Sequence, residues 1–150
     1  SSENEMSVIQ YANLCGIRVV LTADAGRSAL SEAADYAPYA GLVLPGVDRF
    51  QLPHHGSRRN VSSEILDRWL GSRLATRPQT ANGQAASYAI VSSAKEDKDH
   101  PRKAVVRGAI HRGANVLATE GADLRIGHNA PARRSWVAAR PLDYPEEQED

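Results

Sequence analysis

The sequence predicts an α/β protein, because β-rich apolar runs alternate with segments of helical periodicity along the chain. The chain has 150 residues, which is enough for about one domain with a buried core. No internal repeat divides it. We therefore expect a layered arrangement in which helices flank a sheet.

The first half is predicted to contain a hairpin, a helix, a strand and a second helix. Two β-rich runs, 6–11 and 17–22, are separated by a short segment that ends in glycine and predicts a tight turn. A helix is expected over 28–36, with a proline soon after it. A short strand follows at 47–52. The clearest helix covers 62–70, with serine at its start and glycine at its stop.

The second half is predicted to contain a loop, a strand, a helix and a second hairpin. Residues 72–85 are rich in Gly, Ser, Pro, Thr, Asn and Gln, which indicates a mobile loop. A buried strand is expected at 86–91 and a helix at 101–111, where proline suits the first turn. The last hairpin would join 115–119 to 123–127.

The domain is expected to span 1–128, and residues 129–150 are expected to form a polar tail. After Pro131 the sequence becomes polar and ends in the acidic run 145–150, for which we expect disorder.

Composition excludes several function classes. Eighteen basic residues balance eighteen acidic ones, so no global field attracts the chain to nucleic acid or to acidic lipid. A polyanion would have to be held locally, by pairs such as Arg58-Arg59 or Arg133-Arg134. The single cysteine, Cys15, excludes an internal disulfide and fits a reducing compartment. No apolar stretch approaches the ~20 residues that span a bilayer, and no signal-peptide pattern is present. We expect a cytoplasmic protein without a membrane partner.

Candidate chemistry is concentrated at 52–57, where His54 and His55 follow an apolar run and precede a Gly-Ser pair. Upstream, Asp24 closes another apolar run. A carboxylate and an imidazole at the carboxyl ends of neighbouring strands can meet, and oxygen plus nitrogen ligands suit zinc or a similar divalent metal. Two alternatives stay open: Asp24 as a helix cap, and the histidine pair as a surface or capping feature.

Four motifs follow one another along the chain: Thr22-Ala23-Asp24; Leu52-Pro53-His54-His55-Gly56-Ser57; Ile90-Val91-Ser92-Ser93 leading to Asp99-His100-Pro101; and the run 116–119 with Gly121. Their order resembles the C-terminal half of metallo-β-lactamase-fold hydrolases of the competence (DNA-uptake) type. The resemblance covers residues 4 to 127. It implies half of a four-layer αββα fold, with a mixed sheet and flanking helices.

The resemblance also implies roles for individual residues. Asp24 takes the place of the aspartate that binds or bridges the metals, and His55 is favoured over His54 as the histidine ligand. His54 would then face the substrate oxygens. His100 matches the histidine of the family's G-H-P element, as a proton donor or phosphate contact; its alternative is a capping role. The implied cofactor is a pair of divalent metal ions, zinc or else manganese, that activate water for attack on a phosphodiester such as nucleic acid.

Two departures from the family pattern matter. Ala23 stands where the family has glycine. The H-x-H-x-D-H segment, which supplies most metal ligands in the family, is absent from this chain. Zinc sites need three or more protein ligands, and Asp24 with His55 supplies two. We expect the missing ligands to come from the N-terminal half of the same fold, in the same parent chain or in another chain.

A second class of function stays open. A degenerate half of this fold could act as a non-catalytic interaction module, docking on a partner through the edge and apolar surface that the missing half would cover. Lactam-hydrolysing or thioester-hydrolysing relatives are a weaker interpretation, because the His54-His55-Gly56-Ser57 form resembles the competence type.

Overall fold

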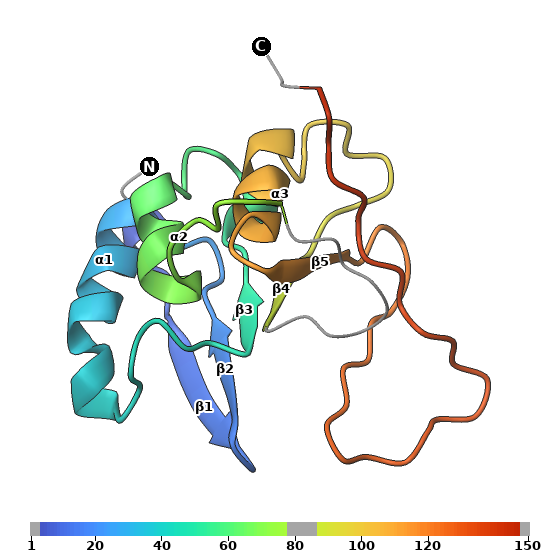
Figure 1. Cartoon of the computed structure of the whole chain (residues 1–150), viewed down its shortest axis with the longest axis horizontal. Helices are drawn as coiled ribbons and strands as arrows, with labels where there is room; N and C mark the ends of the chain where they lie inside the picture. Colours follow the sequence, from blue (N-terminus) through green and yellow to red (C-terminus); the bar gives the residue numbers. More distant parts are fainter. Residues whose placement is uncertain (1–3, 78–86, 148–150) are drawn as a thin grey trace.

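The computed structural model describes residues 4–77 and 87–147. In this part of the chain, a five-stranded mixed sheet with the order β1-β2-β3-β4-β5 is flanked by helices (Figure 1). The α/β class predicted from the sequence is confirmed. The strands are β1 (Gln10–Leu14), β2 (Ile17–Leu21), β3 (Arg49–Gln51), β4 (Ser87–Val91) and β5 (Ala114–Ala118). The helices are α1 (Arg27–Tyr36), α2 (Ser63–Leu70) and α3 (Lys103–Ile110).

The sheet topology places several strand ends at one edge. β1 and β2 form an antiparallel hairpin, whose turn residues Cys15 and Gly16 both have positive φ, 53° and 88°, as a tight hairpin turn requires. β2, β3, β4 and β5 pair in parallel. The carboxyl ends of these four strands therefore lie at the same edge of the sheet, with the loops that follow them.

The first strand begins later than its sequence predicts. Residues 6–9 precede it, and Asn4–Met6 form a 3-10 turn instead. This segment is held away from the sheet because it contacts the start of α1. The Gly26 N–H donates to the carbonyl of Asn4 at 3.1 Å, and the Ala29 N–H donates to the carboxylate of Glu5 at 2.7 Å.

The helices follow their sequence signals closely. The Ser62 hydroxyl accepts from the Ile65 N–H at 3.3 Å, which caps α2, and Gly71 ends it with φ 106°. α3 begins two residues after Pro101. None of the helices in the described part of the chain has the length and apolar character that crossing a bilayer requires.

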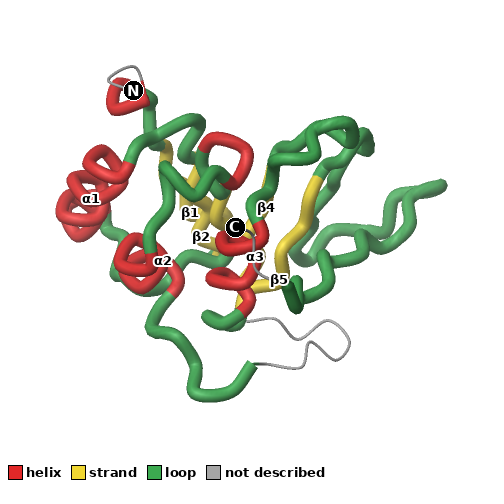
Figure 2. The backbone as a smooth tube through the Cα atoms, turned by 90° about the horizontal axis from the view of Figure 1, so that it is seen from above, coloured by secondary structure: helices red, strands yellow, loops and turns green. Residues whose placement is uncertain are grey.

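One face of the sheet is covered by the helices and forms the core. Val20, Phe50, Ala89 and Val116 are in register across β2 to β5, and all four have no exposed surface. Phe50 stacks on Trp69 of α2 with ring centroids 5.6 Å apart. Figures 1 and 2 show the three helices on this side of the strands. The core therefore lies between this face and the helical layer.

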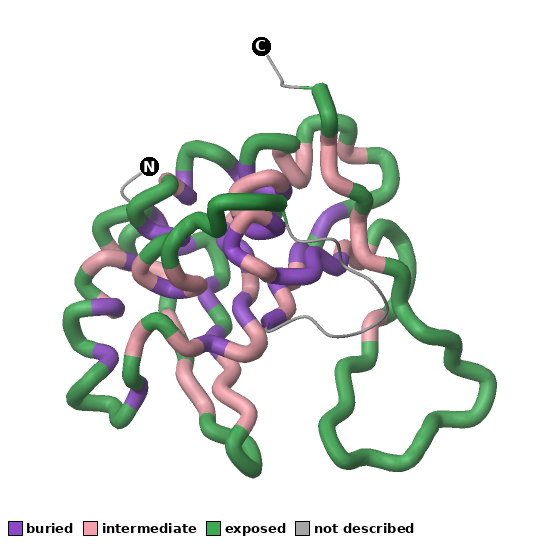
Figure 3. Tube along the Cα trace, viewed as in Figure 1, coloured by how far each residue is buried: buried purple, intermediate pink, exposed green. Residues whose placement is uncertain are grey.

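The opposite face of the sheet is half-exposed. We call it the open sheet face, and it is made by Val19, Leu21, Arg49, Gln51, Tyr88 and Ile90. None of these residues is buried, and Leu21 is 45% exposed. Figure 3 shows buried positions gathered at the sheet centre, whereas the hairpin tip and the long loop after β5 are exposed. Val19, Leu21 and Ile90 give this face half-exposed apolar surface beside polar Arg49 and Gln51, and no helix covers it in the described part of the chain.

The second predicted hairpin is wrong. A turn does form after β5, where Glu120 and Gly121 have positive φ and the Ala122 N–H donates to the Thr119 carbonyl at 2.7 Å. Residues 123–127, however, are not a strand. The backbone next to β5 comes from further along the chain, where the Leu142 N–H donates to the Val116 carbonyl at 2.8 Å. The alternating apolar pattern of 123–127 therefore lacks a strand edge on which to pair.

The end of the chain contacts the domain. Leu142 and Tyr144 are partly buried against the core. Glu146 pairs with Arg77 at 2.5 Å, so the start of the acidic run is held rather than disordered. Residues 78–85 of the predicted mobile loop and the last three acidic positions lie outside the described residues.

Glu5 is predicted to stabilise α1. The N-cap residue, Gly26, has no capping side chain, and the Glu5 carboxylate accepts an orphan N–H of the first turn in its place. Glu5→Ala should lower the free energy of unfolding by about 1 kcal/mol, measured by urea denaturation. Glu5→Gln keeps the accepting oxygen and should lose less. Glu32→Ala, on the exposed side of the same helix, is the control and should change stability little. A Glu5→Ala effect no larger than the control would contradict the capping role.

Candidate functional site

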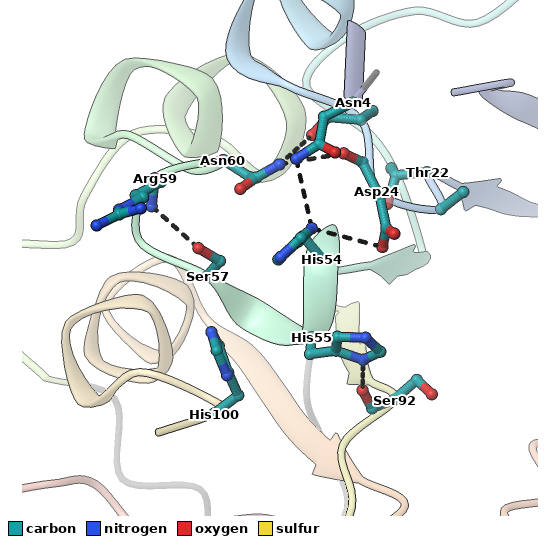
Figure 4. Close-up of polar contacts among 12 residues, drawn as sticks. Asn4, Thr22, Asp24, His54, His55, Ser57, Arg59, Asn60, Ser92 and His100 are labelled. Atoms are coloured by element: carbon teal, nitrogen blue, oxygen red, sulfur yellow. Dashed lines mark hydrogen bonds and ion pairs between the residues drawn. The ribbon is translucent and has the colours of Figure 1, made fainter. Parts of the chain in front are cut away.

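The carboxyl edge of the sheet gathers the residues that the sequence predicts as functional. Asp24 follows β2, His54 and His55 follow β3, and His100 lies between β4 and α3 (Figure 4). These residues are separated by up to 76 positions in the sequence (100 − 24). Their convergence follows from the parallel pairing of the strands that carry them.

Three imidazoles form a nearly equilateral triangle. The ring centroids of His54 and His55 are 5.8 Å apart, those of His54 and His100 are 6.3 Å apart, and those of His55 and His100 are 6.4 Å apart. Two loops supply the three rings. Imidazoles at such spacing can act on one ligand, either as bases and acids or as nitrogen ligands.

The histidine pair is displayed by an unusual backbone. His54, His55 and Gly56 are consecutive left-handed residues, with φ of 47°, 55° and 78°. A left-handed conformation costs about 1–2 kcal/mol for each non-glycine residue. At Gly56 a side chain is also excluded by packing, because a Cβ would lie 2.8 Å from the Cβ of Pro101. Such strain persists only where neighbouring contacts impose it, and it is concentrated at functional sites.

Backbone hydrogen bonds fix this turn between two other segments. The His54 N–H donates to the carbonyl of Ala23 at 3.0 Å, and the Arg102 N–H donates to the carbonyl of Gly56 at 3.2 Å. Ala23 itself is left-handed, with φ 47°. The loops after β2 and β3 and the start of α3 are thus held together.

Asp24 faces His54. Its Oδ1 lies 3.8 Å from His54 Nδ1, and the two side chains are 53% and 37% exposed. Nδ2 of Asn4 is 3.4 Å from the same imidazole nitrogen. Figure 4 shows the carboxylate and the His54 ring turned toward each other, whereas the His55 ring is turned toward Ser92. Asp24 does not cap α1, because the N-cap position is Gly26.

His55 is oriented by a backbone carbonyl. Its Nδ1 makes a short hydrogen bond with the carbonyl oxygen of Ser92. A carbonyl only accepts, so the proton is on Nδ1 and the lone pair is on Nε2. Metal-binding histidines commonly have this arrangement, in which a carbonyl fixes the tautomer and leaves the other nitrogen as ligand. The exposed His55 side chain can therefore offer Nε2 outward.

His100 is oriented by a carboxylate. Its Nδ1 lies 3.1 Å from Oδ2 of Asp97, and the backbone N–H groups of Asp99 and His100 donate to Oδ1 of the same residue. The Asp99 N–H is the main reason that the pKa of Asp97 is lowered, and the His100 imidazole adds to it. Asp97 thus stays ionised and can hold the His100 ring in one orientation.

Three residues that support the site were not identified from the sequence. The buried amide of Asn60 donates to the carbonyls of Asp24 and Ala25, both at 3.1 Å. Gln51 Oε1 accepts from the N–H groups of Thr22 and Ala23, at 2.9 and 3.1 Å. Asp97 is the third. Only Asp97 had a signal, because it lies three residues before His100 in a charged run.

Two cavities open on the histidine cluster. One, of about 340 Å³, is bordered by His54 and His100 together with Ser57, Arg58, Arg59, Asp99 and Arg102. The other, of about 910 Å³, has His55 on its wall beside Ile90, Ser92, Thr119, Leu124 and Trp136, among others. The smaller cavity is therefore strongly basic, and the larger one is a mixed surface under the loop after β5.

The described residues contain no complete set of metal ligands. In residues 4–77 and 87–147, no group of three or more His, Cys, Asp or Glu side chains is placed to hold a metal ion.

Comparison with known proteins identifies no relative: no family model, curated protein or solved structure matches the chain. The site is therefore judged on its own geometry.

Ala23→Gly tests the strain beside Asp24. Glycine tolerates φ 47° freely, and this gain offsets the greater flexibility of glycine in the unfolded chain. We expect an unfolding free energy within about 0.5 kcal/mol of the parent, or higher. The control is Ala33→Gly in α1, which should cost about 1 kcal/mol. Denaturant unfolding measures both, and an equal loss in the two variants would argue against the strained conformation at Ala23.

Proposed function

We propose that this chain is the C-terminal half of a metallo-β-lactamase-fold hydrolase that cleaves phosphodiesters. One observation carries the proposal: the residues of separate predicted motifs converge at one sheet edge, where three imidazoles lie within 6.4 Å of one another beside a carboxylate. Histidines without a role can lie on a surface in an unstrained backbone. The left-handed conformation of both His54 and His55 therefore favours a functional arrangement.

The residues present fit part of a metal site. Asp24 is a half-exposed carboxylate, and His55 offers Nε2 because its Nδ1 is bound to the Ser92 carbonyl. We propose these two as the ligands that this chain contributes, with zinc, or else manganese, as the metal. A pair of such ions, when bound, lowers the pKa of water so that it attacks near neutral pH.

His54 and His100 are proposed to act on the substrate. Both border the smaller cavity, and each ring contacts a carboxylate, Asp24 or Asp97. His100 is the candidate for donating a proton to the leaving oxygen, because Asp97 fixes its Nδ1 and so directs Nε2 away from that carboxylate. His54 would contact the non-bridging oxygens of the substrate.

The arginines beside these histidines support a phosphodiester substrate. Arg58, Arg59 and Arg102 border the same cavity, which holds one acidic residue, Asp99. Arg102 lies 3.6 Å from Asp99, and the backbone of Arg58 is held by Arg27 at 2.6 Å. Guanidinium groups bind phosphate oxygens through paired hydrogen bonds. Because the net charge of the chain is zero, attraction of a phosphodiester would come from these local arginines and not from the overall charge.

The open sheet face supports the proposed partner. In a four-layer αββα fold, this face would pack on the sheet of the N-terminal half, which would bring the missing ligands to the same edge. Val19, Leu21 and Ile90 give it apolar surface. The proposed partner is the N-terminal half of the same fold, in the same parent chain or in another chain.

The same face favours a second candidate function, a non-catalytic interaction module. Metal analysis separates the two, because a docking module needs no metal. We expect near-stoichiometric zinc or manganese, measured by inductively coupled plasma mass spectrometry, when this chain is purified together with its N-terminal half. Metal-free protein in that state would favour the module.

Asp24→Ala tests the enzyme. In protein that includes the N-terminal half, this substitution should abolish phosphodiesterase activity and lower metal content, because it removes a proposed ligand. Asp35→Ala is the matched control; Asp35 is an exposed aspartate of α1 that pairs with Arg68. The control should retain both properties. Unchanged turnover in Asp24→Ala would end the proposal, and equal loss in both variants would show a general folding defect.

A further inference from the structure

A second basic cavity lies along α3, where its lining runs from Ala104 to His111. Its volume is about 300 Å³, and it lies between α2, α3 and the segment after α2. Its charged or titratable lining residues are Arg73, Arg107, His111 and Arg112. This cavity shares no lining residue with the two cavities beside the histidine cluster, so it is separate from them.

One lining residue of this cavity, Arg112, already forms an ion pair with Asp67. The Arg112 side chain is only 3% exposed, and its Nε and Nη2 donate to Oδ1 of Asp67 at 2.9 and 2.7 Å. Two further donors reach the carbonyls of Gly108 and Ser63, at 2.7 and 3.1 Å. Four of the five N–H donors of Arg112 are therefore bound by the protein, and Asp67 compensates its charge.

Two other guanidinium groups have no carboxylate partner in residues 4–77 and 87–147. Arg107 donates to the backbone carbonyls of Pro145 and Glu146, at 2.9 and 3.0 Å, and its guanidinium lies over the Tyr144 ring. Nη2 of Arg73 lies 3.4 Å from Nε2 of His111. Two guanidinium groups thus line one cavity, and neither forms an ion pair within the described residues.

The His111 imidazole lies among these positive charges. Burial lowers the pKa of its imidazole, and nearby Arg73, Arg107, Arg112 and Arg77 lower it further. The ring is therefore neutral at pH 7. Its Nε2 lies 2.9 Å from the hydroxyl of Tyr144, and its Nδ1 is buried without a hydrogen-bond partner in the described structure. An anion bound beside His111 would raise the pKa of its imidazole, opposite to the effect of the arginines.

The acidic end of the chain binds basic residues close to this cavity in the fold. Arg77 pairs with Glu146 at 2.5 Å, and Lys103 lies 3.9 Å from the carboxylate of Glu147. Both carboxylates belong to the acidic end of the chain, which also gives Arg107 its two carbonyls. The tail therefore contacts Arg107 of the cavity lining, but none of its described residues lines the cavity.

We propose that this cavity is a binding site for a phosphate group, either free phosphate or the phosphate of a mononucleotide. Two guanidiniums at one cavity match the oxygens of a phosphate better than a single point charge would. The volume is larger than a phosphate alone requires, which leaves space for a small organic part. The inference goes beyond the proposed hydrolase and does not depend on it.

The test is a binding measurement on the full chain. Isothermal titration with inorganic phosphate at pH 7.5, at ionic strength matched with chloride, should show saturable binding. Arg107→Gln and Arg73→Gln should each weaken it at least about tenfold, which corresponds to about 1.4 kcal/mol. Arg125→Gln, in the exposed loop after β5, is the matched control and should bind as the parent does. Arg73 is exposed and has no ion pair here, so Arg73→Gln should fold normally.

A second readout locates the bound anion. In ¹H–¹⁵N spectra, phosphate should raise the pKa of His111 and leave that of exposed His128 unchanged. Titration with adenosine monophosphate distinguishes the two sources: tighter binding than phosphate indicates a nucleotide ligand, and equal binding indicates the phosphate group alone. Binding that is absent, that matches chloride, that survives both arginine substitutions, or that leaves His111 unchanged would overturn the site. No activity is measured, so this outcome is independent of the hydrolase.

Discussion

The left-handed turn His54-His55-Gly56 is the constraint on which the arrangement of the site depends. Two histidines in this conformation cost about 1–2 kcal/mol each, and the surrounding contacts must offset that cost. The packing of Gly56 against Pro101 leaves the turn no room for a side chain at its third position. Consecutive left-handed residues aim the two rings at different neighbours, Asp24 and Ser92, instead of letting both point into solvent.

Polar side chains next to this turn transmit the same constraint to the neighbouring loops. Gln51 ties the end of β2 to β3, and Asn60 donates to the carbonyls of Asp24 and Ala25. Thr22 adds a hydroxyl bond to the Gln51 carbonyl at 2.8 Å. These bonds hold backbone atoms, and the functional side chains stay half-exposed. Hydrogen bonds thus hold the backbone of these loops, whereas the candidate side chains stay accessible to solvent.

The sequence was a good guide to elements with a local signal and a poor guide to those decided by tertiary contacts. Ser62 and Gly71 mark the ends of α2 through their own capping chemistry, so its bounds were predictable. The backbone bond between β5 and Leu142 joins residues 26 positions apart, which no local periodicity reveals. The prediction of a strand at 123–127 was wrong for this reason. At the site, Asp24, His54 and His100 were recognisable from short motifs, whereas Asn60 acts through backbone carbonyls that carry no sequence signal.

Under the proposed function, the incomplete ligand set and the open sheet face have one cause. The ligand-bearing edge and the open face belong to the same strands, since Leu21 and Gln51 lie on that face at the ends that lead to Asp24 and His54. A second sheet packed there would bury the exposed apolar side chains and bring its own loops to the same edge. The gain from burial would thus hold together a metal site that two ligands alone bind weakly. Under this proposal, docking of the two halves and assembly of the metal site would be a single event.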